Sequence, residues 1–196
     1  MSAFVTLFSD RVCLRQWRDE DREAFAAMNS DARVMEFFRS RLSRTESDEM
    51  VDGIQKHFSK HGFGLWAIEV PGVARFIGFA GLAVPGFNAH FTPCVEIGWR
   101  LAFEHWGQGY ATEAARLALG YGFGTIALPE IVSYTSATNH RSRAVMERLG
   151  MRRDPADDFD YPTLPEGHPL RPHVLYRLGS RSYFGMCRHP IRGLAK

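Results

Sequence analysis

A glycine-rich turn between two segments of different periodicity is the feature that most constrains the fold of this chain. Residues 94–101 alternate as a strand does, residues 109–122 carry alanines at helical spacing, and the turn at 106–109 separates them. Glycines permit backbone angles that side chains forbid, and the first turn of a helix has free N–H groups and a partial positive charge. The turn therefore predicts a phosphate-binding cradle, followed by a helix that can pack closely on a sheet.

The rest of the pattern is typical of a single α/β domain. Further strands are predicted at residues 11–17, 65–70, 75–82, 131–136 and 174–178. Further helices are predicted at 19–29, 45–61 and 141–149, with Thr45 as an N-terminal cap and Gly150 as a C-terminal cap. We expect one domain over residues 1–178, followed by a basic and loosely ordered tail over residues 179–196.

Composition excludes several classes of protein. The chain has 196 residues, 45% of them hydrophobic, and a net charge of +2, which suits a globular domain and lacks the basic excess of a nucleic-acid binder. Cys13, Cys94 and Cys187 have no C-x-x-C spacing, so neither a disulfide framework nor a zinc knuckle is predicted. The uncharged stretch 76–95 is long enough to span a membrane, but prolines and polar residues interrupt it, and the first eleven residues do not resemble a signal peptide. We therefore expect a cytoplasmic protein without membrane or nucleic-acid partners, and base rates favour a homodimer.

The chain also contains partial matches to two other kinds of site. Residues 107–112 fit G-x-G-x-x-T, which is close to the dinucleotide fingerprint, and Glu130 lies near the spacing of a ribose-binding acid. However, Glu130 precedes its strand and no further parallel strand–helix units follow, so an NAD-binding oxidoreductase is a remote alternative. His57 and His61 have the i, i+4 spacing of metal ligands, but they lack the HExxH pattern and a third ligand, so no metal site is predicted.

A second motif follows the strand at 131–136. Residues 139–151 read N-x-x-S-x-x-V-x-x-x-x-G-M. Together with the glycine-rich turn, this motif closely resembles the GNAT superfamily of acyl-CoA-dependent N-acetyltransferases. The nearer resemblance is to the Rim-type ribosomal-protein N-alpha-acetyltransferases, and it covers residues 11–178. Trp106 and Met151 depart from the wider superfamily pattern, but neither change affects a cradle built from backbone.

The resemblance implies a mixed, mostly antiparallel sheet with helices on both faces. In that fold the neighbouring parallel strands 94–101 and 131–136 splay apart and bind acyl-CoA between them. The implied reaction is acetyl transfer from acetyl-CoA to a primary amine by direct attack, without a metal. The acceptor is a protein N-terminus, a peptide or a small-molecule amine. A catalytically silent acyl-CoA sensor or scaffold would share the same cradle and is the alternative function.

The same resemblance identifies residues that would contact coenzyme A. Its pyrophosphate is expected on the amides of 108–112, its pantetheine amide at Asn139, and its 3′-phosphate at one of Arg141, Arg143 and Arg148. A backbone N–H at Ile97 or Gly98 is expected to polarise the thioester carbonyl. The full set of predicted contacts is Ile97, Gly98, Trp106, Gly107, Gln108, Gly109, Tyr110, Ala111, Thr112, Asn139, Ser142 and Arg143.

Two residues are predicted to be catalytic. Glu96 borders the cleft and is the first candidate for the base that accepts the amine proton, with Glu69 and His90 as alternatives. Ser142 is expected to donate a hydrogen bond to the departing sulfur, and its alternative role is to cap its helix. The acidic loop 154–166 is predicted to line the acceptor entrance and attract a cationic amine, or else to be a solvated loop.

Overall fold

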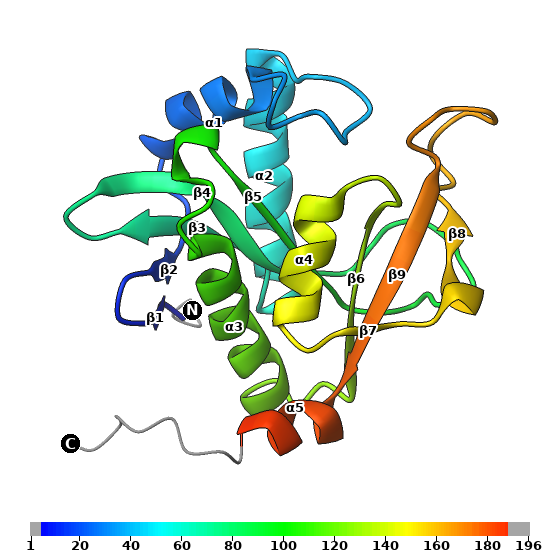
Figure 1. The fold of residues 1–196 in the computed structure, drawn as a ribbon. Helices are drawn as coiled ribbons and strands as arrows, with labels where there is room; N and C mark the ends of the chain where they lie inside the picture. The colour runs from blue at the N-terminus through cyan, green and yellow to red at the C-terminus, as the bar shows by residue number, and fades with distance from the viewer. Residues whose placement is uncertain (1–4, 188–196) are drawn as a thin grey trace.

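Nine strands form one sheet in the computed structural model, which describes residues 5–187 (Figure 1). The strands are β1 (Leu7–Phe8), β2 (Cys13–Arg15), β3 (Leu65–Val70), β4 (Ala74–Ala83), β5 (Glu96–Leu101), β6 (Glu130–Ser136), β7 (Arg152–Arg153), β8 (Phe159–Asp160) and β9 (Pro172–Gly179). Their order is β1-β2-β3-β4-β5-β6-β9-β7, and β8 pairs with β9 outside this path. Every pairing in the described sheet is antiparallel except that of β5 with β6, so the predicted mixed and mostly antiparallel sheet is confirmed.

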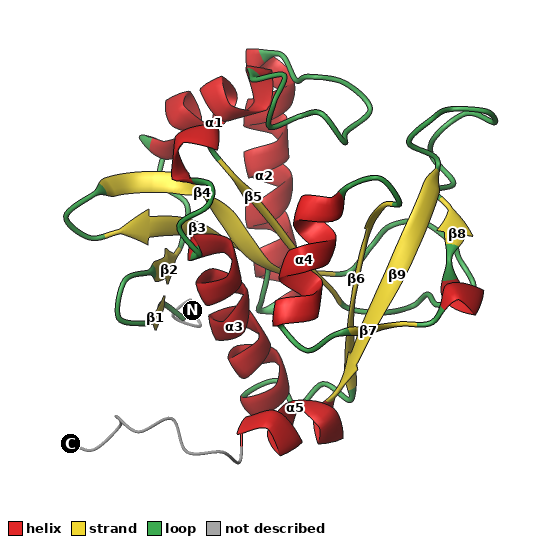
Figure 2. Cartoon of the chain, in the orientation of Figure 1, coloured by secondary structure: helices red, strands yellow, loops and turns green. Residues whose placement is uncertain are grey.

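Helices cover both faces of this sheet (Figure 2). They are α1 (Asp21–Ser30), α2 (Arg44–His61), α3 (Tyr110–Gly124), α4 (His140–Arg148) and α5 (Ser180–Cys187). The small residues predicted on α3 do bring it close to the strands, because Ala114, Ala115 and Ala118 are completely buried. A Cβ added to Gly122 would lie 2.7 Å from the Ile131 side chain, so glycine is needed for this approach.

The parallel pair β5–β6 holds together at a single point. Glu96 and Val132 are its one pair of facing residues, and the N–H of Val132 donates to the carbonyl of Val95 at 3.0 Å. Beyond this point the strands diverge (Figure 1). There the Ser133 hydroxyl, rather than a backbone N–H, donates to the carbonyl of Ile97 at 2.9 Å. The predicted splayed pair is therefore present, and we call its open part the fork.

Several predicted boundaries and caps differ from the structure. The strand predicted at 11–17 is only the three-residue β2, preceded by β1. Thr45 does not cap α2; Ser43 does, in a reciprocal capping box with Glu46. Leu149 is the C-terminal cap of α4, and Gly150 follows it with a φ of +78°.

The chain continues as ordered structure past residue 178. Residues 180–187 form α5, whose Tyr183 ring stacks on Phe123 of α3 with ring centroids 4.7 Å apart. The predicted loosely ordered tail is therefore wrong for this segment, because aromatic packing orders it. The rest of that predicted tail, residues 188–196, lies outside the described residues. Among helices of residues 5–187, none combines the length and the apolar character needed to cross a lipid bilayer.

A buried arginine ties α1 to the sheet. Arg15 of β2 makes two hydrogen bonds of 2.7 Å to the Asp21 carboxylate, and its Nε donates to Glu69 at 2.7 Å. The exposed fractions of Arg15 and Asp21 are only 4% and 1%. Because neither charge is accessible to water, each depends on the other for compensation.

We expect Asp21→Ala to lower the free energy of unfolding by about 3–5 kcal/mol, because it leaves the Arg15 guanidinium buried without its main partner. Thermal denaturation should show this as a drop in Tm of roughly 10 °C. The control is Asp19→Ala, which removes a carboxylate that is 95% exposed and should change stability by less than about 0.5 kcal/mol. Equal effects of the two substitutions would contradict this assignment.

Candidate active site

The predicted cradle lies at the N-terminus of α3. Gly107 and Gly109 adopt φ values of +75° and +84°, which residues with a Cβ rarely adopt. Gly109 is the N-cap of α3 and no side chain caps the helix. Within the described chain, the N–H groups at positions 108–112 have no hydrogen-bond acceptor. These free donors at a positive helix end can hold an anion such as a pyrophosphate.

Arg11 fixes the orientation of this turn, and sequence reasoning did not identify it. Its Nη1 donates to the carbonyl of Gln108 at 3.1 Å, and its Nε donates to the Glu113 carboxylate at 2.8 Å. In a planar trans peptide the C=O and the next N–H point in opposite directions. Holding the Gln108 carbonyl therefore turns the N–H of Gly109 away from Arg11. No local pattern could reveal this contact, because the two residues are 97 positions apart.

Asn139 and Ser142 lie at the start of α4 and are engaged with each other. The Asn139 side chain caps α4 by accepting from the Ser142 N–H at 3.2 Å, and its amide donates to Thr135 at 2.9 Å and to the Ser142 hydroxyl at 3.2 Å. The alternative role of Ser142 as the cap is therefore wrong, since Asn139 has that role. Because the Ser142 oxygen accepts a hydrogen bond, its own proton remains available for donation.

The three candidate phosphate-binding arginines have different surroundings. Arg141 lies over the Trp106 ring at 4.8 Å and over the Phe37 ring at 5.3 Å, and it forms an ion pair with Glu36. Arg143 donates to the carbonyl of Ala137 at 3.1 Å and points toward Tyr176 of β9. Arg148 is exposed at the other end of α4. Of the three, Arg141 is the one that contacts the cradle segment.

The backbone groups that face the open part of the fork are not the predicted ones of Ile97 and Gly98. Since the carbonyl of Ile97 faces β6, alternation along β5 turns the polar groups of Gly98 toward β4, where Gly98 pairs with Gly81. The register of Glu96 with Val132 places the Ile97 N–H against β6 as well. The next groups to face the open part of the fork are those of Trp99, which was not among the predicted residues.

Glu96 lies at the point where the fork opens. It is partly buried, and burial raises the pKa of its carboxyl to about 7, although a hydrogen bond with Tyr134 of β6 opposes the rise. A carboxyl with this pKa exchanges its proton readily near neutral pH. The alternative bases are engaged elsewhere. Glu69 is paired with Arg15, and His90 lies 3.3 Å from Asp157.

The acidic loop is largely neutralised by its own neighbourhood. Asp157 pairs with Arg177 at 2.6 Å, Asp158 pairs with Arg153, and Asp160 pairs with Arg171 at 3.1 Å. Aromatic rings fill the space between this loop and Tyr134, with Phe91 and Phe159 at 4.8 Å between centroids. Asp154 and Glu166 form no ion pair within the described residues, so the pairing removes only part of the negative charge on which attraction of a cationic amine was predicted.

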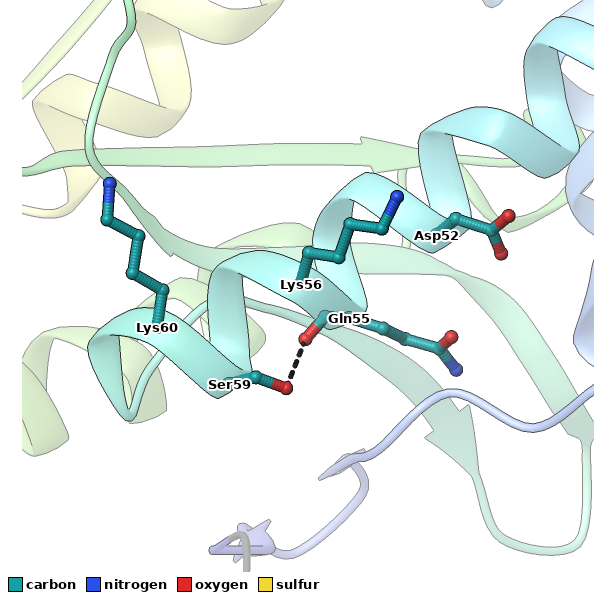
Figure 3. Close-up of a pocket in the computed structure, with 5 residues that line it drawn as sticks. All are labelled: Asp52, Gln55, Lys56, Ser59 and Lys60. Carbon is teal, nitrogen blue, oxygen red and sulfur yellow. Dashed lines mark hydrogen bonds between the residues drawn. The ribbon is translucent and has the colours of Figure 1, made fainter.

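His57 has a structural role. Its Nδ1 lies 2.9 Å from the carbonyl of Phe63, and its Nε2 accepts the N–H of Val84 at 3.0 Å, so both ring nitrogens connect α2 to the strands. In the described part of the chain, no group of three or more His, Cys, Asp or Glu residues could hold a metal ion. A surface hollow on the outer side of α2 brings together residues of that helix alone (Figure 3), and we assign it no role. It is lined by Asp52, Gln55, Lys56, Ser59 and Lys60.

Comparisons with known proteins agree with this geometry. A family model described as an acetyltransferase (GNAT) domain matches residues 11–152. The uncharacterized protein YkkB of Bacillus subtilis is 33% identical, over 77% of this chain and 87% of its own length. The FsC-acetyl coenzyme A-N(2)-transacetylase of Aspergillus fumigatus is 32% identical, over 85% of this chain and 73% of its own length.

Solved structures show the same fold. The crystal structure of an acetyltransferase from Agrobacterium tumefaciens superposes with a TM-score of 0.72 at 27% identity, covering 91% of this chain and 96% of that one. The fork, the uncapped helix and the matched domain thus lead to one assignment: the chain belongs to the GNAT family of N-acetyltransferases.

Proposed function

We propose that this enzyme transfers an acetyl group from acetyl-CoA to a primary amine by direct attack. The observation that carries the proposal is the fork. It places a carboxyl with a pKa near neutrality at an opening between two strands, on the same strand that leads into the phosphate cradle. No observation favours the alternative of a silent sensor, and over residues 5–187 the sheet has one parallel pair rather than the series of parallel strand–helix units that an NAD-binding fold needs.

The cradle and the fork together fit an acyl-CoA. The N–H groups at 108–112 would hold its pyrophosphate, with Arg11 fixing the turn from behind and Arg141 adding a cation beside Trp106. The backbone of Trp99 faces the gap left by β6 and would pair with the peptide-like pantetheine arm. Asn139 would support this arm indirectly, by holding the start of α4 and the Ser142 hydroxyl in place.

Acetyl-CoA supplies an activated acetyl thioester. Glu96 would take the proton from the amine, directly or through water, as the amine attacks the thioester carbonyl. Near neutral pH an α-amine, with a pKa near 8, needs less help than a lysine-like amine with a pKa near 10.4. Ser142 would donate its free hydroxyl proton as a hydrogen bond to the sulfur, which leaves as a thiolate. The Rim-type resemblance makes a protein N-terminus one acceptor to examine, beside peptides and small amines.

The first test is thermal melting with acetyl-CoA, NAD and ATP added separately. A ligand at 100 times its Kd adds about 2.7 kcal/mol of stability, which raises Tm by roughly 5–10 °C for a chain of this length. We expect this rise with acetyl-CoA alone, followed by release of free thiol when a primary amine is also present. A rise with NAD and none with acetyl-CoA would overturn the assignment.

Arg11→Ala should weaken acetyl-CoA binding by roughly 5- to 10-fold. The substitution frees the Gln108 carbonyl and leaves the Glu113 carboxylate unpaired in the first turn of α3, where it repels phosphate. The KM for acetyl-CoA should rise while kcat stays within about twofold, because the contacts of Arg11 are with the cradle and the first turn of α3 and not with Glu96. Arg18→Ala, which also removes a half-exposed arginine, is the control and should leave both constants unchanged. An unaltered Kd for Arg11→Ala would remove Arg11 from the binding site.

Glu96→Gln should reduce turnover by roughly 100- to 10,000-fold without weakening acetyl-CoA binding. In the wild type, kcat/KM should rise with pH until the carboxyl loses its proton at about 7, and the variant should lack this limb. The raised pKa also predicts that the wild type loses stability relative to the variant as pH rises from about 4.5 to about 7, because the folded protein must give up a proton it holds more tightly.

The matched control for this experiment is Glu130→Gln, an exposed carboxylate on the neighbouring strand that pairs with Arg177. It should preserve turnover and the pH profile. Equal loss of turnover and of acetyl-CoA binding in Glu96→Gln would show that Glu96 is structural.

A further inference from the structure

Arg100 of β5 is a partly buried cation without a carboxylate partner in the described part of the chain. Its Nη1 donates to the side-chain oxygen of Asn29 in α1 at 2.6 Å. Its Nε is buried without a hydrogen-bond partner, and no carboxylate of residues 5–187 lies within ion-pair distance. Burial lowers the pKa of Arg100 to about 10, so the guanidinium still carries its charge at neutral pH. A buried, uncompensated charge is costly, so the site favours an anion.

Aromatic rings restrict where an anion can bind to this guanidinium. Phe38, in the segment between α1 and α2, lies over it at 3.9 Å, and Phe79 of β4 lies at 5.4 Å. Asn29 is itself fixed, because its amide donates to Ser47 at 2.9 Å. Phe38 therefore covers one face of the guanidinium, and Nη1 is engaged with Asn29. Nε is enclosed by protein, so among the nitrogens without a partner in the described structure it is Nη2 that a ligand can reach, and Nη2 can donate a charge-assisted hydrogen bond to a carboxylate.

Arg100 lies on the same face of β5 as Glu96, because alternate residues of a strand point to the same side. Gly98 lies between them, and a Cβ added there would meet nothing within 4 Å. Its partner on β4 is Gly81, where an added Cβ would collide with the carbonyl oxygen of Gly64 and lie 2.8 Å from the Trp66 ring, so the open space lies over Gly98. We call the face of β5 from Glu96 to Arg100 the strip. Four residues of strand span roughly 13 Å, which gives the strip room for a small extended molecule.

We propose that the acceptor is a primary amine that also carries a carboxylate, such as an amino acid or a short peptide, and that Arg100 binds this carboxylate through its Nη2. The amine then lies at the Glu96 end of the strip and the carboxylate at the Arg100 end. This inference rests on the proposed acetyl transfer, and it names the substrate class of the same site.

The test compares acceptors that differ only in charge. The probes are β-alanine, γ-aminobutyrate and triglycine, each beside its own carboxamide, with acetyl-CoA and a thiol-release readout. We expect kcat/KM to be roughly 10- to 100-fold higher for each carboxylate than for its carboxamide. Among the carboxylates, kcat/KM should be highest for the acceptor whose distance between amine and carboxylate matches the span from Glu96 to Arg100. Equal rates for carboxylates and carboxamides would overturn the inference and leave the proposed acetyl transfer intact.

Two variants assign the effect to Arg100. Arg100→Met keeps an apolar side chain beside Phe38 and should abolish the preference for carboxylates while preserving the rate with carboxamides. Arg44→Met, which removes an exposed arginine of α2, should keep the preference. If Arg100→Met does not fold, Arg100→Lys replaces it and should reduce the preference, because a compact ammonium does not place a donor where the planar guanidinium places Nη2. A uniform loss with both kinds of acceptor would contradict the assigned role.

A binding measurement separates this inference from the proposed reaction. Calorimetric titration of γ-aminobutyrate and of its carboxamide, with coenzyme A present, requires no turnover. Tighter binding of the carboxylate in the wild type, and not in the Arg100→Met variant, would support the anion site even if no amine were acetylated. Equal binding of the two probes would overturn it.

Discussion

The separation of β5 from β6 is the constraint on which the rest of the structure depends. A sheet interior cannot leave backbone N–H and C=O groups unpaired without a free-energy cost, yet this sheet divides after a single pair of residues. The Ser133 hydroxyl donates a hydrogen bond to the carbonyl of Ile97, and α3 and α4 cover one face of the sheet where β5 and β6 separate. The polar groups that remain open belong to Trp99 and to the first turn of α3, which is where a peptide-like arm and a pyrophosphate can pair. We propose that this unpaired backbone forms the acyl-CoA binding site.

Local patterns in the sequence were sufficient to predict most of the helices and strands and their order along the chain. The change of period at the glycine-rich turn correctly predicted β5 and α3, and the alanines predicted on the sheet side of α3 are buried. The Pro-Gly turn at 71–72 correctly predicted the hairpin that joins β3 to β4. The strand predicted at 11–17 was too long because its alternation continues into residues that leave the sheet. The α5 helix was missed because the basic residues of 188–196 suggested that the whole segment after 178 is a tail, whereas Tyr183 stacks on Phe123 of α3 and holds residues 180–187 against the domain.

The candidate site was predictable only where it depends on adjacent residues. The glycines of the cradle and the strand that carries Glu96 follow from local patterns. The role of Asn139 as the cap of α4, the hold of Arg11 on Gln108 and the isolation of Arg100 depend on which distant residues meet in space. The pKa of Glu96 also depends on burial, which no spacing reveals. Long-range contacts, rather than composition, thus determine the chemistry of the fork.

Arg141 has a thermodynamic consequence of its own. Its guanidinium contacts Trp106 on the cradle side and Phe37 and Glu36 on the segment between α1 and α2, while its backbone belongs to the first turn of α4. A ligand that displaces it from Trp106 must alter its contacts with that segment, and a ligand that moves the segment must alter its contact with Trp106. Linkage requires the two effects to be equal in free energy. Whatever factor the first ligand imposes on the affinity for the second, the second imposes on the first, so one arginine couples the two affinities without favouring either order of entry.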